Sequence, residues 1–411
     1  MARALTAQDA HALMTLIARQ ATGQQTITVT DTSSFVSVGE SVLATGMENV
    51  FNAISLVMGR TFAASRPYKA KLSTINAINT GAYTNRLRKI SFYAKDALAS
   101  GDWNTNLYTN LAEGYDNGSN GTSSTASMWE QHQAMPLEVN FAGQSVWEDA
   151  LTRYEDQVKK AFRSEEEFNI FWGGALTEKG NDIESQKEAF NRMTLLNRIA
   201  GTFALNLDGA INLTQAYNDY FGTSYTSQQL RTTYIQSFLE FFTATFKDVS
   251  NFMTNRSKKY HVPVTKTIDG VQYSILRHTP KDKQRAILYG PLFNKAEALV
   301  FPTIFNKEYL FDPAQHEVVD FWQAEGTPAI DITPAIPNFT TGVQEAGSEV
   351  SKAYIVGVLF DEDALMIDYQ LEAANTTPLE ARKRYRNMWW TFSKNAINDF
   401  TENFVVFYME D

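Results

Sequence analysis

The C-terminal stretch from Lys352 to Asp411 reads KAYIVGVLFDEDALMIDYQLEAANTTPLEARKRYRNMWWTFSKNAINDFTENFVVFYMED. An apolar run from Tyr354 to Phe360 ends in acids, and a second short run follows from Leu365 to Tyr369. A basic stretch then leads to an aromatic strand from Met388 to Phe392, a polar turn and a closing strand from Phe404 to Met409. Short apolar and aromatic runs between polar turns predict the strands of a sheet.

The composition describes a protein of several lobes that contains no cysteine. At 411 residues the chain exceeds what one hydrophobic core usually organises, so we expect two or three lobes. Aromatic residues make up 13%, and such side chains dominate cores and permanent interfaces. The lack of cysteine excludes disulfides and thiolate metal sites. No apolar run approaches the ~20 residues of a membrane span, so we expect neither a signal peptide nor a membrane anchor.

The chain is acidic, with a formal net charge of −10. A protein that holds nucleic acid through its phosphates is normally basic. Any contact with nucleic acid is therefore expected to be weak and non-specific.

Residues 1 to 46 are predicted to form an arm. Its start is amphipathic, its part from Thr26 to Thr32 is Thr-rich and extended, and Gly39 and Gly46 are predicted to break regular structure. A helix is expected from Met47 to Met58, because apolar residues recur along one side of that stretch.

The segment from Arg60 to about Gly143 is rich in Asn, Thr, Ser, Gly and Tyr. Two runs in it, LRKISFYAKDAL and AMPLEVNF, are predicted strands, whereas Glu113 to Ser127 has the composition of a flexible loop. A long two-stranded excursion buries no core of its own. The segment is therefore either disordered or lies on another molecule.

Three helix starts with capping-box spacing follow. They are Ser145 with Glu148, Ser164 with Glu167, and Asn181 with Glu184. Gly180 is expected to end the second helix. The first helix is predicted from a stripe at helical spacing, Trp147, Leu151, Tyr154, Val158 and Phe162. The third is the longest, about 27 residues or roughly 40 Å, with the stripe Ile183, Phe190, Met193, Leu196, Ala200, Phe203 and Leu207.

The pattern becomes mixed in the second half. One helix is predicted from Ser227 to Met253, a short one after Gly290-Pro291, and a Pro/Gly-rich loop from Gly326 to Gly347. Candidate strands are 262–268, 271–277, 286–289 and 318–322.

The search for chemistry finds no catalytic motif. The five histidines, His11, His132, His261, His278 and His316, lack the spacing of a metal pair. Phosphate-loop, dinucleotide, nucleophile-elbow and HExxH patterns are absent. We therefore predict no enzyme activity, no cofactor and no metal.

Clusters of charge have simple interpretations. Glu165 to Glu167 are predicted to be the charge at a helix N-terminus, and Asp361 to Asp363 a solvated turn, with a cation site or a neighbour's arginines as the alternative. The basic runs RSKK (Arg256 to Lys259) and RKRYR (Arg382 to Arg386) are interpreted as a solvated face or an interface patch, with nucleic-acid contact as the alternative.

Four fragments in order carry a family resemblance. They are PLEVNFAGQSVWEDAL, the long helix after Asn181, RAILYGPLFNKAEALVF and the C-terminal block. This order resembles the major capsid proteins of tailed bacteriophages with the Hong Kong 97 shell fold, most nearly those of short-tailed phages (podoviruses).

The resemblance implies an α+β fold in five parts. These are an N-terminal arm and leading helix (1–58), an E-loop crossing the neighbouring subunit (59–143), a P domain with its spine helix (144–209), an A domain (210–347) and the C-terminal part of the P domain (348–411). It implies self-assembly into pentamers and hexamers of an icosahedral head around double-stranded DNA, in the bacterial host cytoplasm. Partners would be a separate scaffolding protein and a portal protein at one vertex, with no membrane.

Subunit contacts are predicted at basic residues near the E-loop base and in the C-terminal run. They are Arg60, Arg66, Lys69, Lys71, Arg86, Arg88, Arg382, Arg384 and Arg386. Two alternatives remain: an encapsulin-type nanocompartment shell, favoured by a cargo-docking surface, and an aromatic-rich carbohydrate-binding protein, for which an export signal would be expected.

Overall fold

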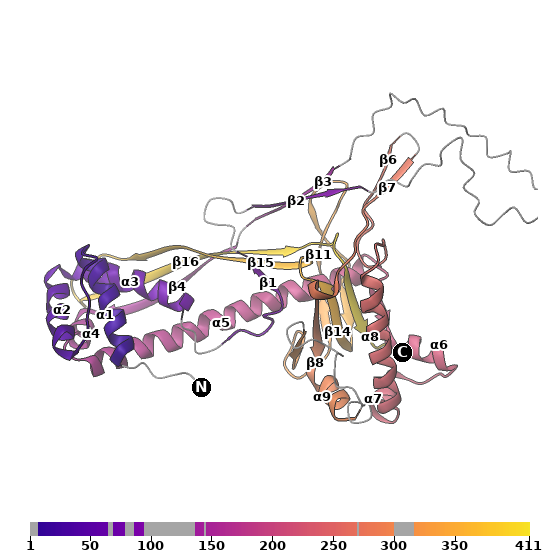
Figure 1. The fold of residues 1–411 in the computed structure, drawn as a ribbon, viewed down its shortest axis with the longest axis horizontal. Coiled ribbons are helices and arrows are strands. Elements are labelled where there is room, and N and C mark those ends of the chain that lie inside the picture. Colours follow the sequence, from indigo (N-terminus) through magenta and orange to yellow (C-terminus); the bar gives the residue numbers. More distant parts are fainter. Residues whose placement is uncertain are drawn as a thin grey trace, which may run out of the picture.

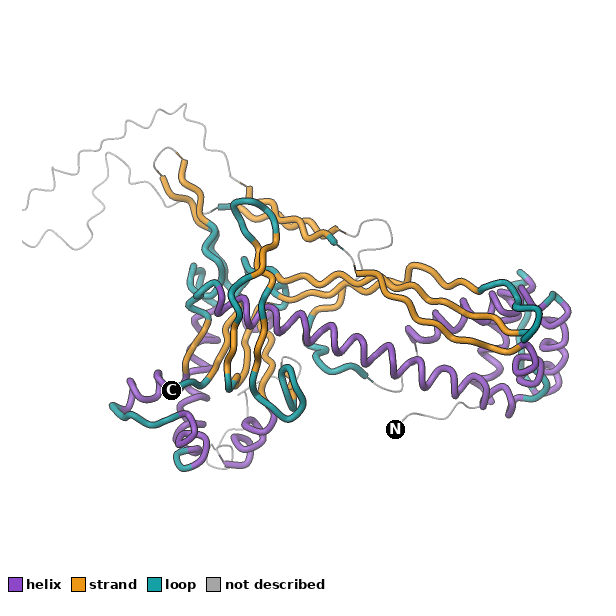
Figure 2. The backbone as a smooth tube through the Cα atoms, turned by 180° about the vertical axis from the view of Figure 1, so that it is seen from behind, coloured by secondary structure: helices purple, strands orange, loops and turns teal. Residues whose placement is uncertain are grey.

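The structure is a computed structural model that describes residues 7–64, 69–78, 86–93, 136–143, 145–268, 271–299 and 316–411. The molecule is elongated, with a group of helices at one end, a mixed body of helices and strands at the other, and one long helix between them (Figure 1). Seen from behind, long strands follow that helix along much of its length (Figure 2). The predicted α+β class is confirmed.

The described helices and strands have the following bounds. The helices are α1 (Ala7–Thr22), α2 (Thr32–Ala44), α3 (Met47–Ala64), α4 (Glu155–Ala161), α5 (Glu165–Ala204), α6 (Leu213–Phe221), α7 (Ser227–Thr232), α8 (Ile235–Met253) and α9 (Gly290–Leu299). The strands are β1 (Asn76–Ile78), β2 (Arg86–Phe92), β3 (Pro136–Ala142), β4 (Ser145–Tyr154), β5 (Ala210–Asn212), β6 (Thr265–Ile268), β7 (Val271–Ser274), β8 (Gln284–Tyr289), β9 (His316–Val319), β10 (Ile330–Ile332), β11 (Ala335–Pro337), β12 (Gln344–Ala346), β13 (Val350–Lys352), β14 (Ile355–Asp361), β15 (Leu365–Thr376), β16 (Tyr385–Asn398) and β17 (Phe404–Tyr408).

The described strands form two main sheets. One has the order β1-β15-β16-β4 and the other β5-β17-β14-β8-β9, while the remaining strands pair as ribbons, β2-β3, β6-β7, β10-β13 and β11-β12. The strands predicted from the C-terminal block are confirmed as β14 to β17. They contribute to both sheets, so this block joins the two halves of the molecule.

Helix α5 spans 40 residues, which at 1.5 Å per residue gives a rod of about 60 Å. Ser164 caps it as predicted, because its hydroxyl accepts a hydrogen bond from the backbone N–H of Glu167 at 3.2 Å. The predicted stop at Gly180 and restart at Asn181 are wrong, since the helix runs through both. An interior glycine costs a helix only about 1 kcal/mol, and burial of neighbours such as Ile183 outweighs it.

The buried stripe of α5 matches the prediction in part. Leu196 and Ala200 are buried, but Met193 is 54% exposed, and Leu195 and Ile199 are buried instead. The four buried residues face the larger of the two hydrophobic cores.

The two cores lie toward opposite ends of α5. The smaller packs α1, α2 and α3 against α4, α5 and β16, around residues such as Phe35, Phe51 and Trp390. The larger surrounds the five-stranded sheet and α8, with β14 buried along its whole length. Two separate cores agree with the expectation of several lobes.

The N-terminal segment is helical where the sequence suggested a break. Residues 7–22 and 32–44 form α1 and α2, which pack with α3 on the smaller core. Gly39 does not break structure: it is buried in α2, where a Cβ would lie 3.1 Å from the backbone oxygen of Phe162. The glycine therefore allows close packing between elements rather than ending a helix.

The helix predicted from Ser145 is wrong. Residues 145–154 form β4, which pairs with β16 from Ser145↔Lys394 to Tyr385↔Tyr154. Trp147 and Leu151 are four residues apart, a spacing that places side chains on one face in both a helix and a strand. Trp147 stacks on Phe392 with ring centroids 4.3 Å apart, and α4 begins only at Glu155.

Two further predictions need correction. The helix expected from Ser227 to Met253 is divided at Thr233 and Tyr234 into α7 and α8. The loop expected from Gly326 to Gly347 contains the short strands β10, β11 and β12.

The two strands predicted around the loop at Glu113 to Ser127 pair as β2 and β3, while residues 94–135 lie outside the described part of the chain. Within the described residues, no helix has the length and apolar character needed to cross a bilayer.

We predict that Gly209→Ala destabilises the larger core. A Cβ at this position would lie 2.3 Å from the backbone oxygen of Phe404, so β17 must shift to admit it. The free energy of unfolding should fall by about 1–3 kcal/mol, measured by denaturant titration. Ser224→Ala, at an exposed residue, is the control, and equal stability of the two variants would contradict the close approach.

Candidate functional site at the base of the hairpin

The β2–β3 hairpin has two unlike faces. Cross-strand partners lie on the same face of a ribbon, so the register places Lys89 with Val139 and Ser91 with Leu137 on one face. Ser91 is buried there. The opposite face carries Ile90 and Phe92, which are 50% and 59% exposed. The first face is thus turned to the body and the second to solvent.

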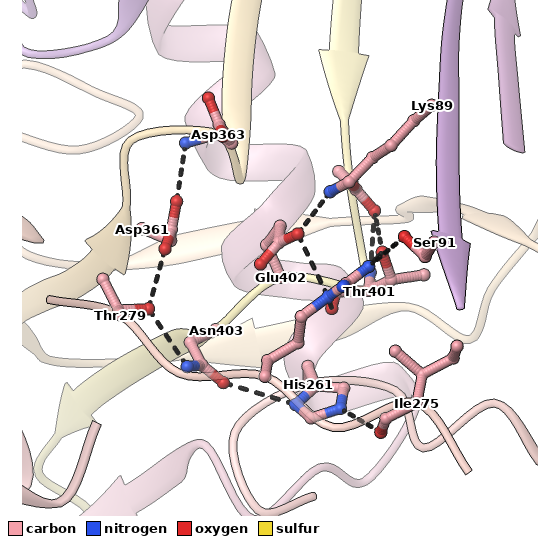
Figure 3. A network of polar contacts seen from close by, with 12 residues as sticks. Lys89, Ser91, His261, Ile275, Thr279, Asp361, Asp363, Thr401, Glu402 and Asn403 are labelled. Carbon is pink, nitrogen blue, oxygen red and sulfur yellow. Dashed lines mark hydrogen bonds and ion pairs between the residues drawn. The ribbon is translucent and has the colours of Figure 1, made fainter. Parts of the chain in front are cut away.

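Lys89 joins the hairpin to the body. Its ammonium forms ion pairs with Asp399 and Glu402, which lie between β16 and β17. Figure 3 shows Lys89 beside Glu402, with the polar groups around them. Asp399 is 1% exposed and Glu402 8%, so both carboxylates are removed from water and depend on nearby cations.

The turn that carries these acids is organised by its own side chains. The Asp399 carboxylate accepts hydrogen bonds from the backbone N–H and the hydroxyl of Thr401, at 2.9 and 2.7 Å. Asp and Thr side chains favour such local turns. The turn therefore presents Asp399 and Glu402 in fixed positions.

Arg277 binds the same turn and the hairpin. Its guanidinium lies 3.1 Å from the Glu402 carboxylate and donates to the Thr401 backbone oxygen at 3.0 Å. It also donates to the Ser91 hydroxyl at 2.7 Å. The hairpin is thus held by two adjacent inward side chains, Lys89 and Ser91.

Arg198 supplies a third cation, from the C-terminal part of α5. It is fully buried, donates to the Glu402 backbone oxygen at 3.0 Å, and its guanidinium lies 4.1 Å from the centre of the Phe400 ring. Burial lowers its pKa to about 9, although Asp399 and Glu402 oppose the shift. We call Lys89, Arg198, Arg277, Asp399 and Glu402 the hairpin anchor.

The charges of the anchor shift one another's pKa values. Burial tends to lower the pKa of Lys89, but Asp399 and Glu402 raise it overall. Burial tends to raise the pKa of Asp399, but Lys89 and Thr401 lower it overall. For Glu402 burial dominates and the pKa is raised, against the pull of Lys89 and Arg277. The anchor therefore holds a charged Lys89–Asp399 pair.

A second chain of hydrogen bonds lies beside the anchor (Figure 3). Thr279 donates to the Asp361 carboxylate at 2.7 Å, and Asn403 donates to the Thr279 hydroxyl at 3.1 Å. The Oδ1 atom of Asn403 lies 3.3 Å from Nδ1 of His261. Asp361 is 7% exposed, so the predicted solvated turn is wrong for this residue: the strand end lies within the core.

The predicted contact residues do not gather at one site. Lys71 pairs with Asp320 at 2.5 Å, Arg88 with Glu138 at 2.7 Å, and Arg384 with Glu155 at 3.0 Å. Arg386 is buried, with its guanidinium 5.3 Å from the centre of the Phe51 ring. Lys69 and Arg382 are exposed. Arg66 and the side chains of Arg60 and Arg86 lie outside the described residues. Roles at subunit contacts remain predictions for this set.

Other candidate groups have structural roles within the chain. Glu165 to Glu167 form the first turn of α5, as predicted. In the RSKK run, Lys259 lies 4.9 Å from the centre of the Phe252 ring, while Arg256 and Lys258 are exposed. Among the described residues, no three His, Asp or Glu side chains are grouped so as to hold a metal.

Sequence reasoning missed the anchor. The usable signals were a lysine at an inward position of a predicted strand, and acids three residues apart in the polar turn NDFTEN. Neither signal indicates its partner, because Lys89 and Asp399 are separated by 310 positions.

Comparison with known proteins gives similarity in structure only. No protein-family model and no curated protein matches the chain. A chain in the capsid structure of Staphylococcus phage Andhra is 11% identical with a TM-score of 0.49, covering 84% of this chain and 85% of the other. A chain in the capsid structure of Cyanophage P-SCSP1u is 8% identical with a TM-score of 0.42, covering 85% and 90%. Similarity at this level assigns no function.

We predict that Lys89→Met loosens the hairpin. The change leaves the buried carboxylates of Asp399 and Glu402 without their shared cation, and breaking such a pair costs about 3–5 kcal/mol. Hydrogen exchange should accelerate in β2 and β3 while α5 stays protected. Arg88→Met, which removes only a partly exposed pair, is the matched control, and equal exchange in both variants would argue against the anchor.

We predict that Asp361→Asn stabilises the protein at neutral pH. Burial raises the pKa of Asp361, so folding disfavours its charged form, and wild-type stability rises as pH falls through the folded pKa. The free energy of unfolding of the variant should exceed that of wild type by about 1 kcal/mol at pH 7. This difference should disappear in acid, below the pKa of Asp361 in the folded protein. Thermal unfolding at a series of pH values measures it, and a gain that is independent of pH would disprove the assignment.

Proposed function

We propose that the chain is a shell subunit, the major capsid protein of a tailed bacteriophage with the Hong Kong 97 fold, most like those of short-tailed phages. Copies assemble in the bacterial host cytoplasm into pentamers and hexamers of the icosahedral head that encloses double-stranded DNA. Its role is structural rather than catalytic.

The outer face of the hairpin carries this proposal. A two-stranded ribbon alone is marginally stable in water, yet β2 exposes Ile90 and Phe92, and the charged side chain Arg88 on the same face is neutralised by Glu138. The anchor fixes the inner face to the body and leaves the outer face uncovered among the described residues. A second copy that covers Ile90 and Phe92 removes this apolar surface from water.

The rest of the architecture fits the same role. The parts proposed are the arm and leading helix (1–58), E-loop (59–143), P domain (144–209 and 348–411) and A domain (210–347). The long helix α5 separates the two cores, so that one subunit can reach several neighbours. Contacts that are individually modest then add up to strong overall binding through multivalency. The net charge of −10 suits a container whose wall adheres weakly to packed DNA.

The proposed partners follow from this role. They are other copies of the chain, a separate scaffolding protein during assembly and a portal protein at one vertex. Packaged DNA would touch the inner wall without sequence preference.

We predict that the double variant Ile90→Ser/Phe92→Ser assembles poorly. Loss of two interfacial apolar side chains should lower the yield of sedimenting particles about tenfold, measured by gradient sedimentation and electron microscopy of the full chain expressed in bacteria. Leu16→Ser, at an exposed apolar residue of α1, is the control. A wild-type chain that stays monomeric at high concentration, with the hairpin protected from exchange, would refute the proposal.

A further inference from the structure

An aromatic patch lies on the outer side of α8 and contains none of the anchor residues. It consists of Tyr220 and Phe221 at the end of α6 and Tyr234 before α8, which are 74%, 50% and 36% exposed. In Figure 1, α6 lies beyond α8 at the end of the molecule opposite the N-terminal helices. Patches of this kind on soluble proteins mark interaction sites.

The rings of the patch are held in place before any partner binds. Tyr217 is buried beneath them, with its hydroxyl 2.7 Å from that of Ser237, and its ring centroid lies 4.6 Å from that of Phe221. Tyr234 stacks on Tyr225 at 4.0 Å. Rigid aromatic side chains lose little conformational entropy on binding, which favours a strong contact.

The surrounding sequence is almost uncharged. From Gly209 to Leu239 the charged residues are Asp219 and Arg231, and the Arg231 guanidinium lies over the Tyr354 ring at 4.2 Å. Depletion of charge with enrichment of tyrosine and phenylalanine is the composition of an interface core. A chain of net charge −10 contacts a like-charged copy with least repulsion at such a surface.

The rim of the patch is acidic and has a basic counterpart elsewhere on the chain. Asp219 is exposed on α6, and Asp411 is held beside α7 because its carboxylate accepts from the backbone N–H of Ser227 at 2.5 Å. At the other end of α8, about 28 Å along the helix, Arg256 and Lys258 are exposed and have no ion pair among the described residues. Backbone hydrogen bonds between Ser257 and Arg277 fix this basic loop.

We propose that the aromatic patch of one copy binds the basic loop, Arg256 to Lys259, of a second copy. Asp219 and Asp411 then face Arg256 and Lys258 while the aromatic rings fill the centre. The two surfaces are different, so the contact is head-to-tail, and such a contact generates rings when the rotation between copies closes. The proposal rests on the proposed shell function and names the contact that closes the ring.

The central test removes the aromatic rings from the full-length chain. Tyr220→Ser/Phe221→Ser should raise the protein concentration at which half of the chains sediment as assemblies about tenfold. Tyr220→Ser alone should act in the same direction with an unchanged thermal midpoint, because this ring is mostly exposed. Val343→Ser, at a 60% exposed apolar residue of another hairpin, is the matched control and should assemble as wild type.

A charge exchange tests the partner surface. Asp219→Lys and Arg256→Asp should each weaken assembly a few-fold, and the double variant carrying both should recover it. If wild type assembles and Tyr220→Ser/Phe221→Ser assembles at the same concentration, the contact is wrong while the shell function stands. If the double charge variant is no better than the single ones, the basic loop is not the partner. If wild type forms no assemblies, either alone or with its scaffolding protein, both proposals fail.

Discussion

The contact between Lys89 and the turn at Asp399 and Glu402 is the constraint that orients the rest of the molecule. It ties the hairpin to the junction of the two sheets, and Arg198 ties the same turn to α5. A charged anchor fixes direction, because ion pairs and hydrogen bonds in a buried site tolerate little change in geometry. An apolar contact of equal area would allow the hairpin to slide or to fold its apolar outer face onto its own body.

Features that depend on local pattern could be predicted from the sequence. The two hairpin strands, the cap at Ser164 and the C-terminal strands are each encoded within a few residues. The errors arose where one pattern permits two structures. Trp147 and Leu151 share a face in a helix and in a strand, and the pairing of β4 with β16 decides between them. Gly39 and Gly180 suggested breaks, but packing against other elements sets their conformation.

The anchor could not be predicted, for a different reason. Its members come from the hairpin, α5, the segment after β7 and the turn before β17, and no local rule pairs Lys89 with a carboxylate 310 positions away. The sequence predicted subunit contacts near the E-loop base and in the C-terminal basic run, but Lys71, Arg88 and Arg384 are paired within the subunit. The sequence shows where a charged residue stands, but it does not show whether the partner of that residue belongs to the same chain or to another copy.

Charged and apolar side chains would have separate roles in the proposed shell subunit. The described cations that anchor the hairpin are buried or partly buried and act inside the subunit. Four apolar side chains, by contrast, are exposed and are not covered by any other described part of the chain: Ile90 and Phe92 on the hairpin, and Tyr220 and Phe221 on α6. Burial of apolar surface is non-directional and strengthens with each added copy. In a shell subunit of the kind proposed, internal ion pairs would set the direction of each limb, and the exposed apolar faces would then draw copies together along those directions. A shell needs both, because a limb that is free to turn would join copies at many angles and close none of them.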